Sequence, residues 1–257
     1  PKKNYYLVHK KSLVNFGKYL KIYEGLNLKF KRVKMNNYSK FVNSEQFSGC
    51  INTEEGVILI EKLIPFLKKE LAKKTKIHLG SNVDQIDSKN GYVFLNKKKF
   101  KKYDLIINTT YENPNLGLKK NKFKLKFELT GMVKILKPFS EQVGITIMDG
   151  LFCSLYPQNK KECTISSVKF TPIYKSSSFK KINNKIKTLN KDKVKKNIIN
   201  HAAKFLNLKK KEMRSKLILS HKVKLKNDKN DVRTSSIKFE NKLISILCGK
   251  IDAAPVI

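Results

Sequence analysis

The sequence has few residues of the kinds that hold metal ions, and it has no long apolar segment. Its four cysteines form no C-x-x-C pair, and its four histidines are scattered along the chain. Because zinc ligands usually cluster at short spacings, no metal site is expected. No apolar run approaches the roughly 20 residues that span a bilayer, and no basic-then-apolar signal segment opens the sequence. We therefore expect a cytoplasmic protein with no membrane partner and with reduced, mostly buried thiols.

Arginine is also scarce, although the chain is strongly basic. The formal net charge is +36, from 56 basic and 20 acidic residues, yet only Arg32, Arg214 and Arg233 are arginines. Specific readers of nucleic acid depend on arginine for its bidentate fork. The lysines are spread along the whole chain, and charge runs of this kind usually face solvent. A solvated lysine surface is the favoured interpretation, and a lysine-driven module that binds nucleic acid or an anionic surface is the competing one.

The length of 257 residues and the hydrophobic content of 40% are sufficient for one large domain or two interleaved domains with a core. A strand is expected at 5–8, followed by a helix that ends at Gly25. From Phe123 onward, alternating apolar residues predict strands. Between 176 and 208 two helices are expected, with Asn190 as their break or cap. Strands return at 217–219 and 243–247, so the expected fold class is mixed α/β (α+β), with antiparallel strands and helices to one side.

An amphipathic helix led by acidic residues is predicted after residue 51. Its cap is expected at Asn52 or Thr53, with Glu54 and Glu55 near the positive end of the helix. Pro65 lies inside the pattern, where it removes a backbone donor, so we expect a kink or a late start. The apolar face would be made by Ile60, Leu63, Ile64, Leu67 and Leu71.

Short strands are predicted to follow this helix. Runs at 77–80, 83–86 and 92–95 are rich in β-branched and aromatic residues, with Asn90-Gly91 as the clearest turn among them. The next run, 104–108, is apolar on both faces and ends at small hydroxyl residues, as a buried parallel strand meeting a ligand does. Ligands bind at the carboxyl ends of such strands, so a site is expected in the segment that holds Thr109, Thr110 and Tyr111.

This order of elements resembles the FAD-dependent oxidoreductases of the D-amino-acid oxidase-like (DAO) family. In that family a long helix leads to a strand, here near Val83, whose backbone meets the adenine side of FAD. The strand that ends at Thr109-Thr110 would return to the dinucleotide. Segments 144–157 and 168–172 are similar to the substrate-domain sheet of a bacterial subgroup. The resemblance covers most of the chain.

Two segments near the end of the chain extend the resemblance. Residues 231–235 and 248–252 are similar to the late family segments that line the flavin ring. Both depart from the family pattern, because Thr234 stands where proline is usual and Cys248 stands where the first glycine is usual. The family also opens with a G-x-G-x-x-G turn that holds the pyrophosphate, and this pattern occurs nowhere in the sequence. We therefore expect an internal fragment of a longer protein.

The resemblance implies a partial FAD/NAD(P)-binding Rossmann-like domain interleaved with an antiparallel-sheet substrate domain. The expected division is a substrate-domain segment at 1–47, an FAD-binding segment at 48–118, the substrate domain at 119–240, and a return to the FAD-binding domain at 241–257.

The resemblance also implies site residues. Contacts to FAD are expected from Val83, Thr109, Thr110, Gly249, Lys250 and Ile251, and contacts to a small-molecule substrate from Arg233 and Tyr111. Glycine would let the backbone approach the flavin edge, and a neighbouring lysine would stabilise the anionic reduced ring. Each residue has an ordinary structural alternative: a turn glycine with a surface lysine, a salt bridge for the arginine, and strand-capping polarity for the threonines and the tyrosine. Tyr156 and His221 are weaker candidates, and no residue is assigned as catalytic.

These patterns favour an FAD-dependent oxidoreductase that oxidises a C–N or C–O bond of a small polar metabolite. Flavin chemistry requires little acid–base machinery from the protein, so the lack of a catalytic triad does not count against it. The competing hypotheses are the lysine-driven binding module and a remnant of the flavin fold that has lost catalysis.

Overall fold

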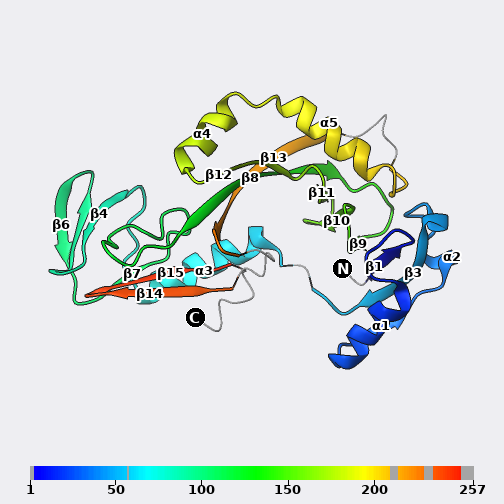
Figure 1. Cartoon of the computed structure of the whole chain (residues 1–257), viewed down its shortest axis with the longest axis horizontal. Helices are drawn as coiled ribbons and strands as arrows, with labels where there is room; N and C mark the ends of the chain where they lie inside the picture. Colours follow the sequence, from blue (N-terminus) through cyan, green and yellow to red (C-terminus); the bar gives the residue numbers. More distant parts are fainter. Residues whose placement is uncertain (1–2, 57, 209–213, 229–233, 250–257) are drawn as a thin grey trace. The chain divides into compact units, whose positions relative to one another are not determined.

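The computed structural model describes residues 3–56, 58–208, 214–228 and 234–249. The chain forms two compact units, each built from three separate stretches of sequence. Unit 1 comprises 1–67, 129–173 and 188–220, and unit 2 comprises 68–128, 174–187 and 221–257. Figure 1 shows the elements of each unit.

Most of a mixed nine-stranded sheet belongs to unit 1, whereas its residues 125–128, 174–176 and 221–225 belong to unit 2. Its order is β12-β8-β11-β10-β9-β1-β3-β2, and β13 also pairs with β8. Strand β1 lies between β9 and β3, parallel to β9 and antiparallel to β3. The pairs β9–β10, β10–β11, β11–β8 and β2–β3 are antiparallel. The strands are β1 (Lys3–His9), β2 (Phe30–Arg32), β3 (Phe47–Thr53), β8 (Leu125–Leu136), β9 (Val143–Met148), β10 (Cys153–Pro157), β11 (Glu162–Ser167), β12 (Pro172–Ser176) and β13 (Ser215–Leu225).

One face of this sheet forms the main hydrophobic core. Alternate residues of a strand point to opposite faces, and Leu7, Ile145 and Leu155, from three adjacent strands, are completely buried on this side. Helix α5 (Lys191–Ala202) packs against β10 and β11 and contributes Ile198 (Figure 1). The side chain of Asn190 accepts a hydrogen bond from the amide of Lys193, so the predicted cap of this helix is confirmed.

The opposite face of the sheet is partly covered by α1 (Phe16–Gly25), whose Tyr19 and Leu20 pack with Val8 and Ile51. A glycine in β3 allows this approach. A Cβ atom at Gly49 would lie 2.4 Å from the ring of Phe16. The short elements α2 (Met35–Tyr38) and η1 (Ser44–Gln46) complete the N-terminal part of the unit.

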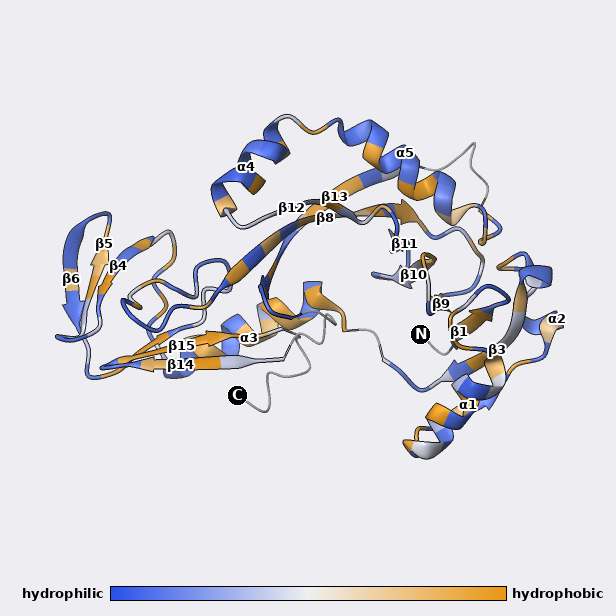
Figure 2. Ribbon diagram, viewed as in Figure 1, coloured by the Kyte–Doolittle hydropathy of each residue, from blue (hydrophilic) through white to orange (hydrophobic). Residues whose placement is uncertain are grey.

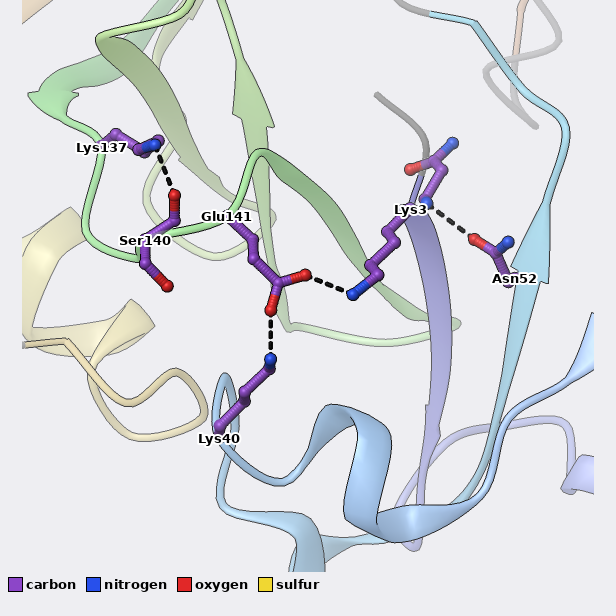
Figure 3. Close-up of polar contacts among 7 residues, drawn as sticks. Lys3, Lys40, Asn52, Lys137, Ser140 and Glu141 are labelled. Atoms are coloured by element: carbon purple, nitrogen blue, oxygen red, sulfur yellow. Dashed lines mark hydrogen bonds and ion pairs between the residues drawn. The ribbon is translucent and has the colours of Figure 1, made fainter.

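An ion-pair cluster joins three segments of unit 1 (Figure 3). The carboxylate of Glu141, in the turn before β9, contacts the ammonium groups of Lys3 in β1 and Lys40 after α2. The hydrogen bonds from Lys3 and Lys40 lower the pKa of Glu141 to about 2. The carboxylate therefore remains charged throughout the physiological pH range.

Unit 2 contains two three-stranded sheets. The antiparallel sheet β4-β5-β6 comprises β4 (Val83–Asp87), β5 (Tyr92–Leu95) and β6 (Lys98–Lys102). The mixed sheet β14-β15-β7 comprises β14 (Ser236–Glu240), β15 (Leu243–Leu247) and β7 (Ile106–Asn108). Strand β15 is largely hydrophobic (Figure 2). Helix α4 (Phe179–Lys187) also belongs to this unit.

A glycine fixes the loop that follows β7. Gly117 has φ of +85°, a backbone conformation that side chains with a Cβ rarely adopt. A Cβ atom here would lie 2.8 Å from atoms of both Ile86 and Leu243. The loop can therefore pack against β4 and β15 only because this position has no side chain.

Helix α3 (Ile60–Lys74) begins later than the predicted cap. Asn52 and Thr53 are the last residues of β3, so their assignment as a helix cap was wrong. Backbone pairing with β1 uses this segment instead. Pro65 lies within the helix, and the late start that it predicted is observed. The apolar face of α3 is not buried, since Ile60, Ile64 and Leu71 are each more than 40% exposed.

Several local predictions were also wrong or incomplete. Residues 77–80 form no strand. The prediction that 104–108 is buried on both faces was wrong too, because Ile107 is 56% exposed. Strands β6, β11 and β14 had not been predicted. No helix among the described residues is long and apolar enough to cross a membrane.

Candidate functional site

The clearest candidate site lies within unit 2, where β7 and β15 end. These strands are parallel, and Leu243, Ile244 and Ser245 pair with Ile106, Ile107 and Asn108. The carboxyl ends of parallel strands lie at the same edge of a sheet. The segment that begins at Thr109 and the segment that begins at Cys248 therefore leave the sheet at one edge, although they are more than 130 residues apart in sequence.

The buried side chain of Asn108 organises the first of these segments. Its Oδ1 accepts hydrogen bonds from the amide and the hydroxyl of Thr110, at 3.0 and 2.8 Å. Its Nδ2 donates to the carbonyl oxygens of Asn113 and Leu116, at 3.1 and 3.4 Å. Ser245 of β15 donates to the carbonyl oxygen of Pro114. Both strands therefore hold the loop in place at the edge where they end.

Tyr111 occupies an unusual position in this loop. Its φ of +56° lies in the left-handed region, which costs a bulky residue roughly 1–2 kcal/mol. The phenol oxygen accepts a hydrogen bond from the amide of Val223 at 3.1 Å and keeps its own proton available for donation. The neighbouring Glu112 lies 3.1 Å from Nδ1 of His221. The surrounding structure thus maintains a strained backbone and fixes the tyrosine, as is common at functional sites.

Thr109 and Thr110 are exposed at this edge. The hydroxyl of Thr110 is bound to Asn108. Gly249 is half-buried just beyond β15, next to Cys248, whose Sγ lies 3.7 Å from the hydroxyl oxygen of Ser235. Parallel pairing thus brings three predicted FAD contacts, Thr109, Thr110 and Gly249, to one edge of the sheet.

Val83 lies elsewhere in the same unit. It lines a cavity of about 330 Å³ together with residues of β5 and with Leu105, Ile106 and Ile107. The structure therefore places Val83 beside the body of β7. Lys250, Ile251 and Arg233 lie outside the described residues.

A second polar cluster lies in unit 1, on the sheet face opposite the main core. Of its residues the sequence had indicated only Tyr156, as a weaker candidate. Tyr6 in β1, Thr146 in β9 and Tyr156 in β10 present three hydroxyl groups there. The phenol oxygen of Tyr156 lies 2.6 Å from the hydroxyl oxygen of Thr146 and 3.5 Å from that of Tyr6. The signal in sequence was polar residues at alternate positions of these strands, which reveals a shared face only when the strand register is known.

No group of three or more His, Cys, Asp and Glu side chains among the described residues is arranged so that it could hold a metal ion. The four cysteines are not in disulfides, and burial raises the pKa of Cys163 to about 11 and that of Cys153 to about 12. Those two thiols are therefore protonated and inert at neutral pH.

No protein-family model and no curated protein sequence matches the chain. Solved structures do match it over most of its length. Glycine oxidase from Geobacillus kaustophilus aligns with a TM-score of 0.68 over 96% of this chain and 66% of that one, at 10% identity. L-proline dehydrogenase from P. horikoshii aligns with a TM-score of 0.63 over 97% and 68%, at 11% identity. An FAD dependent oxidoreductase from Pseudomonas aeruginosa aligns with a TM-score of 0.58 over 80% and 57%, at 8% identity.

The chain has a DAO-like fold. This confirms the resemblance and the fold class expected from the sequence. At 8 to 11% identity the likeness concerns the fold, and the chain spans about two thirds or less of the length of these three structures.

The candidate edge in this DAO-like fold has the features that a dinucleotide site requires from two parallel strands. It offers exposed hydroxyls on one strand end and a glycine on the other, and buried Asn108 holds the loop that follows the hydroxyls. A glycine permits close approach of a flat ring, and exposed threonines offer donors and acceptors for ribose or phosphate oxygens. The residues at this edge therefore fit part of an FAD site.

Proposed function

We propose that the chain is part of an FAD-dependent oxidoreductase of DAO type. The observation that carries this proposal is the parallel pairing of β7 with β15 within a DAO-like fold. It places Thr109, Thr110 and Gly249 at the carboxyl edge of one sheet, and open α/β sheets bind their ligands at this edge. FAD is the cofactor that the proposal requires.

Each chain segment has a defined task in this proposal. FAD would supply the hydride acceptor, and the protein would orient the substrate and tune the ring. Gly249 would lie against the flavin edge, and Lys250 and Ile251 would continue along it. Thr109 and Thr110 would contact the dinucleotide, and the segment near Val83 would lie toward its adenine end. The strained loop conformation at Tyr111 keeps the tyrosine fixed on Val223, so little conformational entropy would be lost on binding.

The proposed substrate is a small polar metabolite whose C–N or C–O bond would be oxidised when its carbon atom gives up a hydride. Tyr111 and Arg233 are the proposed substrate contacts, since a phenol and a guanidinium can hold a carboxylate by hydrogen bonds. A cytoplasmic location and the absence of a nucleic-acid partner remain predictions of the lysine composition and of the sequence pattern.

The pyrophosphate part of the site is proposed to come from a segment outside this sequence. The sequence contains no G-x-G-x-x-G, and β7 is the outer strand of its sheet, with Leu105 and Ile107 more than half exposed. A further parallel strand beside β7 would cover these residues. A strand followed by a glycine-rich turn would also supply the helix N-terminus that pyrophosphate requires.

The proposal is tested by absorbance spectroscopy on the longest reading frame that contains this sequence, purified with added FAD. We expect a yellow protein with the bands of oxidised flavin, and bleaching by a substrate under anaerobic conditions. Gly249→Val should weaken FAD binding about tenfold or more, because a branched side chain would occupy the place of the ring edge. Gly25→Val is the matched control, since a Cβ at Gly25 meets nothing within 4 Å.

Other outcomes discriminate between the hypotheses. A colourless protein that binds DNA with a steep salt dependence would instead support the lysine-driven binding module. A yellow protein that no amine or alcohol bleaches would support a remnant of the flavin fold. Equal FAD affinity of Gly249→Val and the parent would remove Gly249 from the site.

A further inference from the structure

A carboxylate joins the hydroxyl cluster of unit 1. Glu55, in the segment after β3, accepts hydrogen bonds on Oε2 from the phenol of Tyr6 and, at 3.2 Å, from Nδ2 of Asn4. The phenol oxygen of Tyr6 also contacts that of Tyr156, which in turn contacts the hydroxyl oxygen of Thr146. The cluster of Asn4, Tyr6, Glu55, Thr146 and Tyr156 is therefore a connected network drawn from three adjacent strands and one loop, and we call it the Glu55 cluster.

Neighbouring strands fix the geometry of this network. Asn4 and Tyr6 pair with Gly144 and Thr146 across the parallel β1–β9 ladder. A Cβ atom at Gly144 would lie 2.4 Å from Oδ1 of Asn4, so the missing side chain makes room for the amide. Asn4 is completely buried, and its Nδ2 is directed at Glu55 and at the hydroxyl of Thr53. The carboxylate is thus held by a rigid part of the sheet.

The carboxylate has donors but no cation. Glu55 makes no ion pair with any described lysine, arginine or histidine, and the hydrogen bonds that it accepts from described residues go to Oε2 or to its backbone oxygen. Its neighbour Glu54 is different, because it lies 3.9 Å from Lys29.

The phenol of Tyr6 keeps its proton. Burial, and hydrogen bonds to Glu55 and Tyr156, raise its pKa far above the usual value of 10. This phenol therefore offers a lone pair as well as a proton. The cluster carries one negative charge on Glu55, and Glu55 is exposed while the three hydroxyl residues are half-buried.

We propose that the Glu55 cluster binds the ammonium group of a cationic small molecule. An ammonium has three donors; Oε1 of Glu55 would accept one, and the phenol oxygens of Tyr6 and Tyr156 are placed to accept the others. A charge-assisted bond to a carboxylate is about twice as strong as a neutral one. The inference concerns unit 1 alone and does not depend on the flavin chemistry proposed above.

A binding experiment without flavin turnover tests the site. The protein is titrated by NMR or calorimetry with n-butylammonium, n-butanol and butyrate, three probes that share one alkyl chain and differ in charge. We expect binding of n-butylammonium only. Glu55→Gln should weaken that binding about tenfold or more, because it replaces a charge-assisted hydrogen bond with a neutral one. Tyr156→Phe should weaken it by about threefold.

Matched variants keep the test specific. Glu54→Gln removes the adjacent carboxylate, which pairs with Lys29, and should bind n-butylammonium as the parent does. Glu55→Asp retains the charge on a shorter side chain and should lie between the parent and Glu55→Gln. Circular dichroism and the thermal midpoint establish that each variant is folded.

The proposal is overturned if Glu55→Gln binds n-butylammonium as tightly as the parent, if n-butanol binds equally well, or if Glu54→Gln loses as much affinity. Failure of this site is distinguishable from failure of the flavin hypothesis. A colourless protein that binds n-butylammonium through Glu55 would refute FAD chemistry and retain the site. A yellow protein without amine binding would do the reverse.

Discussion

Unit 1 and unit 2 differ in how much apolar surface they bury for themselves. Of the large side chains that are fully buried among the described residues, all but Ile182 and Leu243 belong to unit 1. Unit 2 leaves Leu105, Ile107 and Phe239 more than half exposed, in or beside its mixed sheet. The two units therefore differ in how many large side chains they bury completely, although unit 1 also leaves side chains such as Leu13, Leu26 and Leu151 more than half exposed.

The largest effect should come from deleting core volume in unit 1. Leu155 is completely buried within the main core, so Leu155→Ala should cost about 2–5 kcal/mol of unfolding free energy. Ile107→Ala in unit 2 removes an exposed side chain and should cost less than about 0.5 kcal/mol. Hydrogen exchange with peptide resolution measures each unit separately. An equal loss of unfolding free energy in the two variants would contradict the proposed difference between the units.

A smaller effect is expected at the loop glycine of unit 2. Gly117→Ala adds a Cβ at positive φ, where it would meet Ile86 and Leu243 at 2.8 Å. We expect a loss of about 1–3 kcal/mol that is confined to peptides of unit 2. Gly25→Ala, at a position with open space, is the control. Unchanged exchange near β4 and β15 would show that the loop can relax without cost.

Removing a helix cap should have a still smaller effect within unit 1. Asn190→Ala deletes the acceptor for the amide of Lys193 at the start of α5 and should cost about 1 kcal/mol. Lys191→Ala, in the first turn, leaves the cap intact and serves as the control. The thermal midpoint and the exchange of the first turn of α5 report the difference. A cap that contributes nothing would leave both variants alike.

The smallest expected effect is a dependence of the stability of unit 1 on pH. Burial lowers the pKa of both His9 and His201 below the ordinary value of 6.5. The unfolded chain then binds protons more readily than the folded one as the pH falls. Stability should be constant above pH 6.5 and should decline below it, until the folded histidines are themselves protonated. Urea midpoints between pH 8 and pH 5 measure the slope.

A histidine variant tests whether His201 causes the loss of stability at low pH. His201→Gln should reduce the acid loss, whereas His78→Gln, at an exposed position of unit 2, should leave it unchanged. Stability of unit 1 that rises between pH 6.5 and pH 5 would contradict the assignment.

The sequence predicted elements whose pattern is local. Strand β15 was predicted with its observed bounds, and the cap at Asn190 was correct, because both depend on neighbouring residues. Strand β6 was missed because its sequence, KKFKK, has no apolar alternation, and its pairing with β5 determines its conformation. Asn52 and Thr53 have cap chemistry, but pairing with β1 and β2 places them in a strand.

One candidate site could be predicted from local sequence patterns, and the other could not. The ends of β7 and β15 were predicted because each strand is a short apolar run followed by small residues, and the resemblance joined them. The Glu55 cluster was not predicted because Tyr6 and Tyr156 are 150 residues apart. Only the strand order β10-β9-β1 brings them together. Register between distant strands is determined by the whole sheet, and no local pattern specifies it.

The two sheets of unit 2 end in outer strands of opposite character. Lysine occupies four of the five positions of β6, and Nζ of Lys99 lies 3.4 Å from the ring centroid of Tyr92. Such charge discourages another chain from adding a strand along that border. The border at β7 carries Ile106, Ile107 and Asn108 and has no charge. If the isolated chain self-associates at high concentration, intermolecular strand pairing should begin at β7, and a lysine at position 107 should suppress it.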